Sequence, residues 1–139
     1  MKKKKSIVLA LVAMVALAIF CAIVIAPGFS KQGNAYITDY SVSEDGTEMT
    51  ITIGLFTSMG YVREVSVHQQ HGGKLYLDCY SAFGGLNGSW GAKDTYTIPL
   101  EEDTEIIALY RAANCYETVL EKDANGVWQH AEVKQSPNC

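Results

Sequence analysis

The stretch MTITIGL, residues 49–55, alternates apolar and hydroxyl-bearing side chains. Met49, Ile51 and Ile53 fall on one face of an extended segment, and the intervening threonines fall on the other. This period of two is typical of a half-buried β-strand, because successive side chains of a strand point to opposite faces of the sheet. The stretch therefore predicts a sheet with one face in a core and one face in water.

The same alternation recurs at short intervals along the chain. It is found at 64–68, 75–80 and 96–100, and turn-forming residues separate the runs at 44–46, 71–73 and 123–126. In the last turn, Asn125 and Gly126 tolerate positive φ angles, which predicts a β-hairpin over 116–133. Pro99 has no N–H group to donate, so its strand should end there or lie at a sheet edge.

About seven to eight short strands at regular spacing define the expected architecture. We expect no helix among them and predict an all-β fold, an antiparallel immunoglobulin-like β-sandwich that follows one N-terminal transmembrane helix. The segment 101–123 leaves an alternative open, because Ile106 and Leu109 also fit a helical stripe. The turn-forming pair Asn114-Cys115 favours two strands in this segment.

The first 26 residues differ from everything that follows. Lys2–Lys5 form a basic cluster, and residues 7–26 then carry no charged side chain. Twenty helical residues span about 30 Å, the thickness of the hydrocarbon core of a bilayer. Because positive residues stay on the cytoplasmic side, we expect a retained single-pass anchor in the cell membrane, with its N-terminus inside and residues 27–139 outside. A signal peptide that is cleaved to give a secreted product is the alternative.

The predicted organisation has five segments. They are a cytoplasmic basic segment at 1–6, the transmembrane segment at 7–26, a linker at 27–35, the β-sandwich domain at 36–133 and a tail at 134–139. Four of the 11 basic residues precede the transmembrane segment, which leaves seven against 15 acidic residues and gives the exported part a formal charge of −8. This charge argues against nucleic acid as a partner, because phosphates require a positive surface.

The stretch AFGGLNGSWGAKD, residues 82–94, is rich in glycine. A phosphate-binding loop requires regularly spaced glycines with a helix behind them, and neither feature is present, so we expect no cofactor. Glycine also supplies the positive φ angles that let a connection cross between sheets. We predict a structural crossover with Trp90 folded inward, and a ligand loop with an exposed Trp90 is the alternative.

Three of the four cysteines lie in the exported part. A disulfide between Cys79 and Cys115 would close a loop of about 36 residues and stabilise the domain by about 3–4 kcal/mol. Two buried free thiols are the alternative. A thiol redox role lacks the Cys-x-x-Cys pair that such proteins use.

No arrangement of reactive residues in the sequence matches a known catalytic pattern. No serine or cysteine lies in a recognisable setting with a histidine and an acid. His68, His71 and His130 would bind zinc only if the fold gathered them, and we expect solvated histidines and no metal. The sequence therefore favours a protein that is not an enzyme.

The strand at 75–80 carries the candidate ligand-contacting residues. Tyr76 and Tyr80 lie on its polar face with Asp78 between them, and aromatic rings beside a carboxylate can stack on a sugar and hydrogen-bond to it. Packing between neighbouring strands also explains these residues. We expect a non-enzymatic interaction or structural module at the cell surface, with a surface protein or a glycan as partner. A glycan-binding module that uses these three residues and Trp90 is the alternative.

Three longer stretches carry a resemblance. They are TSMGYVREVSV at 57–67, KLYLDCYSAFGGLNGSWGAKDTYTIPL at 74–100 and IIALYRAANCYETVLEKD at 106–123. Over most of residues 36–130 the chain resembles a group of uncharacterised small β-sandwich proteins of Gram-positive bacteria that are membrane-anchored or secreted. The resemblance implies an extracytoplasmic location and supplies no catalytic residue. Cys79 and Cys115 depart from that group.

Overall fold

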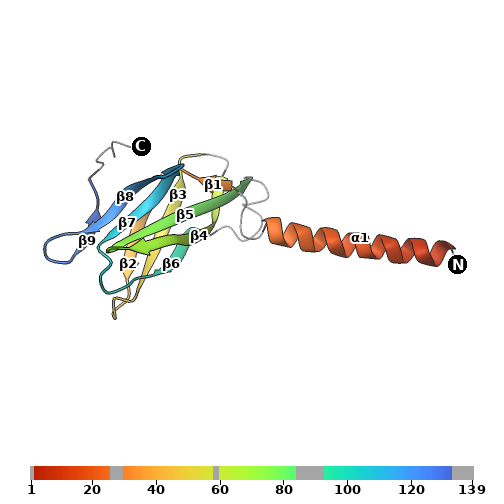
Figure 1. The fold of residues 1–139 in the computed structure, drawn as a ribbon, viewed down its shortest axis with the longest axis horizontal. Helices are drawn as coiled ribbons and strands as arrows, with labels where there is room; N and C mark the ends of the chain where they lie inside the picture. Colours follow the sequence, from red (N-terminus) through yellow and green to blue (C-terminus); the bar gives the residue numbers. More distant parts are fainter. Residues whose placement is uncertain (1, 26–29, 58–59, 84–92, 133–139) are drawn as a thin grey trace.

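One helix and two β-sheets make up the described part of the chain, which is residues 2–25, 30–57, 60–83 and 93–132 of a computed structural model (Figure 1). The elements are α1 (Lys2–Ile25), β1 (Ser30–Gln32), β2 (Ala35–Val42), β3 (Glu48–Leu55), β4 (Gly60–His71), β5 (Lys74–Phe83), β6 (Thr95–Pro99), β7 (Ile106–Ala112), β8 (Cys115–Lys122) and β9 (Trp128–His130). A β-rich fold behind a single apolar N-terminal helix is therefore confirmed.

The smaller sheet has the strand order β2-β3-β6 and is antiparallel. In β3, Met49 and Ile51 are buried, as the alternation of MTITIGL predicts. Thr50 lies on the other face, where its hydroxyl is 3.3 Å from the hydroxyl of Thr97 in β6. β6 is an edge strand and ends at Pro99, which confirms the prediction made from proline.

The larger sheet is built around β5, which pairs with three strands. β4 follows one edge of β5 in antiparallel pairing. The other edge is shared, because β7 pairs with residues 74–77 and β1 pairs with residues 79–81. β8 and β9 extend the sheet beyond β7.

The pairing of β5 with β7 is parallel, so the prediction of a wholly antiparallel sandwich is wrong for this pair. The chain passes from β5 to β6 in the smaller sheet and returns through 100–105 to begin β7 beside the start of β5. A crossover connection permits a parallel pair, whereas a short hairpin does not. Alternation predicts which face a strand buries, but it does not predict which strand lies beside it.

The connection between β1 and β2 takes the chain from the larger sheet to the smaller one. A Cβ atom at Gly33 would overlap the carbonyl oxygen of Arg111, so the close approach requires glycine. Arg111 Nη1 donates hydrogen bonds to the carbonyl oxygens of Gly33 at 3.2 Å and Ala35 at 2.6 Å. The larger sheet therefore begins inside the stretch 27–35, ahead of the domain boundary that we expected.

The segment 101–123, for which a helix was the alternative, forms the two strands β7 and β8. The prediction of two strands is therefore confirmed. Asn114 lies between them with a φ of 60°, a left-handed conformation that asparagine tolerates. The predicted hairpin is also present, as β8 and β9. In its turn, Asp123 accepts hydrogen bonds from the N–H groups of Asn125 at 2.8 Å and Val127 at 2.9 Å.

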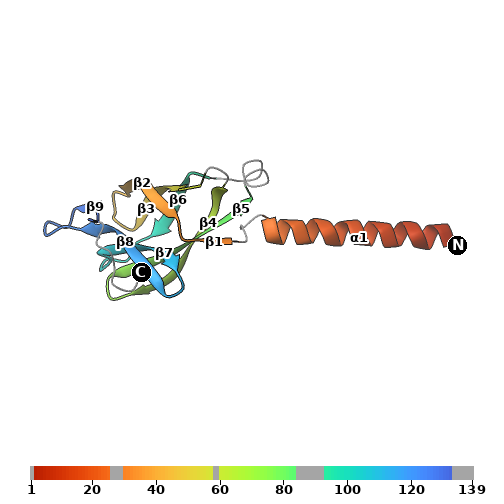
Figure 2. The same cartoon turned by 90° about the horizontal axis from the view of Figure 1, so that it is seen from above.

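The two sheets form two layers, with β2 and β3 on one side and β7 and β8 on the other (Figure 2). Their facing apolar side chains make the core, which includes Met49, Ile51, Leu75, Leu77, Ile98, Ile107 and Leu109. Along the chain, β5 in one layer is followed by β6 in the other. Residues 84–92, with Trp90 among them, lie outside the described residues.

Candidate functional site

The candidate residues on β5 lie on the outer face of the larger sheet. Tyr76 and Tyr80 are half-buried, whereas Asp78 between them is only 2% exposed. A carboxylate this buried requires hydrogen-bonding neighbours that cover it. We call this group the outer cluster, and its members are Lys31, His68, Tyr76, Asp78, Tyr110 and Tyr116.

Asp78 is the acceptor at the centre of the outer cluster. Its Oδ2 atom lies 2.6 Å from Lys31 Nζ and 3.3 Å from His68 Nδ1. Tyr116 donates a hydrogen bond from its hydroxyl to Oδ1 at 2.8 Å. Lys31 also lies over the ring of Tyr110, 4.2 Å from its centroid. Side chains from β1, β4 and β8 therefore occupy both carboxylate oxygens.

Aromatic packing surrounds these polar contacts. The ring of Tyr116 lies edge to face with Tyr76 at 5.1 Å and with Tyr110 at 5.7 Å, and it stacks with His68 at 5.6 Å. Such separations are typical of packed aromatic pairs. The geometry of Tyr76 therefore favours cross-strand packing, one of the two interpretations left open by the sequence.

The two groups that face Asp78, the Tyr116 phenol and the Lys31 ammonium group, stay protonated at neutral pH. Burial, followed by the hydrogen bond to Asp78 and its negative charge, raises the pKa of Tyr116 to about 12. Burial alone would lower the pKa of Lys31, but the hydrogen bond and the charge of Asp78 outweigh it and raise this pKa. Asp78 thus faces a phenol and an ammonium group that both keep their protons. The arrangement ties β1 to β5 and suits a structural role better than that of a general base.

The cysteines differ from both alternatives. Cys79 is a free, buried thiol on the core face of β5, and Cys115 at the start of β8 is disulfide-bonded, so the expected bond between these two is wrong. Cys79 lies on β5 and Cys115 on β8, and β7 lies between these two strands in the sheet. The spacing of the cysteines in the sequence does not reveal this separation. Cys21 is also free, and the fourth cysteine, Cys139, lies outside the described residues.

Cys79 is also poorly suited to redox chemistry. Burial is the main cause that raises the pKa of its thiol to about 12, and the negative charge of Asp78 adds to this effect. A thiol with so high a pKa forms little of the nucleophilic thiolate at neutral pH. The geometry therefore assigns Cys79 to the core.

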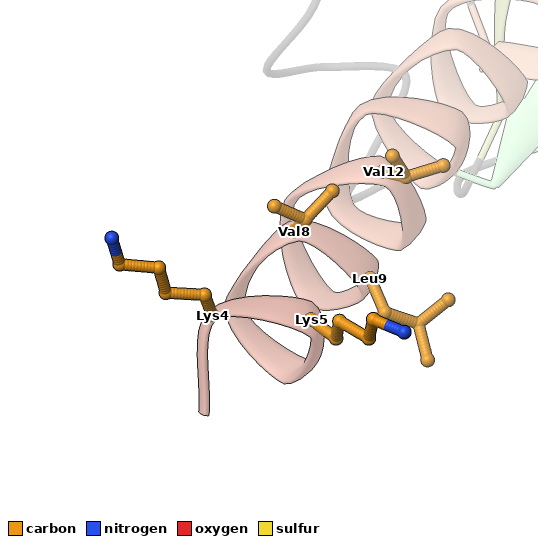
Figure 3. Close-up of a pocket in the computed structure, with 5 residues that line it drawn as sticks. All are labelled: Lys4, Lys5, Val8, Leu9 and Val12. Atoms are coloured by element: carbon orange, nitrogen blue, oxygen red, sulfur yellow. The ribbon is translucent and has the colours of Figure 1, made fainter. Parts of the chain in front are cut away.

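The helix α1 contains a 21-residue apolar span, Lys3–Ile23, none of which is buried. Figure 3 draws five residues of its first turns as sticks: Lys4, Lys5, Val8, Leu9 and Val12. All five project outward from the helix, so lysines border the apolar surface. A helix that is apolar on all sides and exposed is matched to lipid. α1 is a candidate membrane span or signal sequence.

A groove of about 450 Å³ lies between the end of β2 and the β8–β9 hairpin. Its apolar lining comes from Tyr40, Val42, Leu100, Val127 and Trp128. Its charged lining comes from Glu101, Glu102 and Lys122. We call it the distal groove, because the β8–β9 hairpin lies at the end of the domain away from α1 (Figure 1).

The floor of the distal groove is fixed by the fold. Trp128 is only 9% exposed, Tyr40 donates a hydrogen bond from its hydroxyl to the Trp128 carbonyl oxygen at 2.6 Å, and Lys122 Nζ lies 5.2 Å from the Trp128 ring centroid. Val42 and Val127 are 39% and 60% exposed. The groove therefore combines an aromatic floor with two apolar side chains that remain open to solvent.

The acidic rim of the distal groove belongs to the loop 100–105. Glu101 and Glu102 are exposed, and no ion pair involves either of them within the described residues. Thr104 is fully buried, and its hydroxyl accepts hydrogen bonds from the Glu101 N–H at 3.1 Å and from Gln70 Nε2 at 2.9 Å. The backbone that carries the two glutamates is thus held in place by a buried side chain.

Two further carboxylates keep this end of the domain negative. The Ser43 hydroxyl, followed by the N–H and hydroxyl of Thr47, lowers the pKa of Asp45 to about 2. The N–H groups of Val127 and Asn125 lower the pKa of Asp123. The turns that carry Asp45 and Asp123 each contain a glycine that lines the groove. The negative charges of these two aspartates therefore add to the electrostatic field of the rim.

Sequence reasoning did not identify the distal groove. The acidic residues at 101–105 predict only a solvated loop. The pattern around Trp128 predicts only that this residue belongs to a hairpin strand. The usable signal was Val127, an apolar residue directly after the turn residue Gly126. Placing it beside Leu100 requires the long-range return of the chain into β7, which the pattern of side chains does not specify.

The three histidines lie apart, and His71 is exposed at the end of β4, opposite Lys74. His68 contacts Asp78 in the outer cluster, and His130 packs edge-on against Tyr40 at 5.5 Å near the groove. Within residues 2–25, 30–57, 60–83 and 93–132, no group of three histidine, cysteine, aspartate or glutamate side chains is arranged to hold a metal ion.

No family model, curated protein or solved structure matches this chain. The resemblance to Gram-positive surface proteins therefore stays a prediction.

Proposed function

We propose that this chain is a single-pass membrane protein whose β-domain acts outside the cytoplasm as a non-enzymatic interaction module. The observation that carries the proposal is the separation of two surfaces, since α1 is apolar on all sides and the distal groove lies at the other end of the domain. An anchor at one end and a concave surface at the other suit a domain that presents its groove away from the membrane.

Three features support the details of this proposal. The basic cluster Lys2–Lys5 before the apolar span favours an N-terminus in the cytoplasm, by the positive-inside rule. The packing of two sheets supports an immunoglobulin-like architecture, from which β1 and the parallel β5–β7 pair are departures. The saturated Asp78 and the protonated, buried Cys79 support a non-enzymatic role.

Labelling of intact cells tests the topology. A membrane-impermeant amine reagent should modify the exposed Lys74 and Lys93 and leave Lys3–Lys5 unmodified, with the full-length chain recovered from the membrane fraction. Modification of Lys3–Lys5 without Lys74 and Lys93 would contradict the proposal. A soluble product that begins near Tyr36 would favour the secreted alternative.

Glycan binding is a second candidate function. It is supported by Tyr80, which is half-buried on the outer face beside Asp78. Against it, Lys31, His68 and Tyr116 already occupy the Asp78 carboxylate. A panel of cell-wall and host glycans tests this candidate, because binding that is lost on Tyr80→Ala would place the ligand surface on the outer face of the larger sheet.

A further inference from the structure

We infer that the distal groove binds a basic peptide segment of a partner protein, in which an apolar side chain is flanked by lysine or arginine. This inference rests on the proposed function and names the partner class of the same module. It combines the apolar lining of the groove, the exposed carboxylates on its rim and its position at the end away from α1.

The apolar part of the groove sets the first requirement on the ligand. Val42 and Val127 remain substantially exposed above the buried Trp128. Covering them with an apolar side chain removes that surface from water, and a volume of about 450 Å³ accommodates a side chain of the size of leucine together with part of its backbone. A purely polar ligand would leave this gain unused.

The rim sets the second requirement. Glu101 and Glu102 are carried by a loop whose backbone the buried Thr104 holds in place, so both exposed carboxylates stay at the rim of the groove. Lys122 is the cation in the lining, and it lies over the Trp128 ring. The remaining charge is negative, which attracts cations and repels acidic segments.

The two requirements together favour a basic peptide over the other ligand classes. A neutral glycan would use the aromatic floor but gain little from the two carboxylates. An anionic lipid surface or a nucleic acid would be repelled by the negative charge of the rim and of the turns at Asp45 and Asp123. A peptide in which cationic side chains flank an apolar one satisfies both the lining and the rim.

The experiment uses the full chain in nanodiscs of phosphatidylcholine, a lipid without net charge. The probe is the fluorescent peptide Gly-Lys-Arg-Leu-Leu-Lys-Arg-Gly, with empty nanodiscs as the blank. Two control peptides replace both leucines by serine or all four cationic residues by glutamate. Fluorescence anisotropy should show saturable binding of the probe, binding at least about tenfold weaker for the serine peptide, and none for the acidic one.

Matched variants locate the binding surface. The double variant E101Q/E102Q should bind the probe about five- to tenfold more weakly and lose part of its salt dependence. The double variant E64Q/E132Q removes the same charge elsewhere on the domain and should bind like the unaltered chain. Val127→Ser should weaken binding of the leucine probe and leave the already weak binding of the serine peptide unchanged.

Each contrary outcome has a distinct meaning. Equal binding by the two double variants, or no binding of the probe, would overturn the basic-peptide inference. The labelling experiment on intact cells decides the proposed function separately, because it does not depend on any ligand.

Discussion

The outer cluster and the distal groove contain the same kinds of side chain, aromatic rings beside carboxylates, and differ in how the carboxylates are satisfied. Asp78 is buried and contacts three partners, whereas Glu101 and Glu102 are exposed and form no ion pair within the described residues. A desolvated, paired carboxylate holds elements together, and a hydrated, unpaired one is available to a partner. Composition alone does not distinguish the two roles, whereas burial and pairing do.

The largest expected effect breaks the outer cluster. Asp78→Asn removes the charge that faces Lys31 and weakens the acceptor of the Tyr116 hydroxyl, so we expect the free energy of unfolding to fall by about 2–4 kcal/mol. Lys31 is 28% exposed, which keeps the effect below that of a fully buried pair. Chemical denaturation of the full chain in detergent measures it. The exposed Asp39→Asn is the control, and equal stabilities of the two variants would contradict a structural role for Asp78.

Alkaline pH should weaken the same region. The pKa of Tyr116 is raised from 10.0 to about 12 in the folded chain, so its stabilising contribution is fully present below pH 10 and is lost as the pH rises towards 12. The raised pKa of Lys31 acts in the same direction. We expect the free energy of unfolding to decrease over this range, and to decrease less in Tyr116→Phe. Identical pH profiles for the two chains would show that the phenol of Tyr116 does not contribute.

A smaller effect is expected where β1 leaves the cluster for the other sheet. Gly33→Ala places a methyl group against the carbonyl oxygen of Arg111, and we expect a loss of about 1–3 kcal/mol. Gly46→Ala is the comparison, because Gly46 has a φ of 72° but open space around its Cβ position. Its strain should cost about 1 kcal/mol. Thermal unfolding measures both variants. If Gly46→Ala lost more stability than Gly33→Ala, the backbone around Gly33 would relax easily to admit the methyl group.

The smallest effect belongs to the groove. Glu102→Gln removes an exposed charge without an ion-pair partner among the described residues, so we expect the free energy of unfolding to change by less than about 0.5 kcal/mol. The same chemical denaturation that is applied to Asp78→Asn measures it. A loss of more than 1 kcal/mol, which is on the scale of a lost hydrogen bond, would indicate that the rim is structural.

Local patterns predicted the strands and turns of this domain well. The alternation from Met49 to Ile53 indicates which side chains are buried, and Asn114 and Gly126 mark turns that the chain makes. These features depend on residues close in sequence, whose side-chain periodicity and φ preferences are visible in the sequence itself.

The contacts between segments that are distant in the sequence could not be predicted from these local patterns. The parallel β5–β7 pair, the disulfide state of Cys115 and the partners of Asp78 all depend on which distant segments lie side by side. All of β2, β3 and β4 lie between Lys31 and Asp78 in the sequence, and no periodicity links these two residues. The distal groove also combines segments from β2, the loop 100–105 and the β8–β9 hairpin, so sequence reasoning placed the candidate site on β5 instead.

Hydrogen–deuterium exchange of the full chain, with and without the peptide Gly-Lys-Arg-Leu-Leu-Lys-Arg-Gly, tests most directly whether the outer cluster supports the fold and the distal groove binds the partner. We predict that the peptide slows exchange at residues 100–105 and 122–128 and leaves residues 74–82 unchanged. Protection confined to 74–82, or no protection in a chain that binds the peptide, would contradict this division of roles.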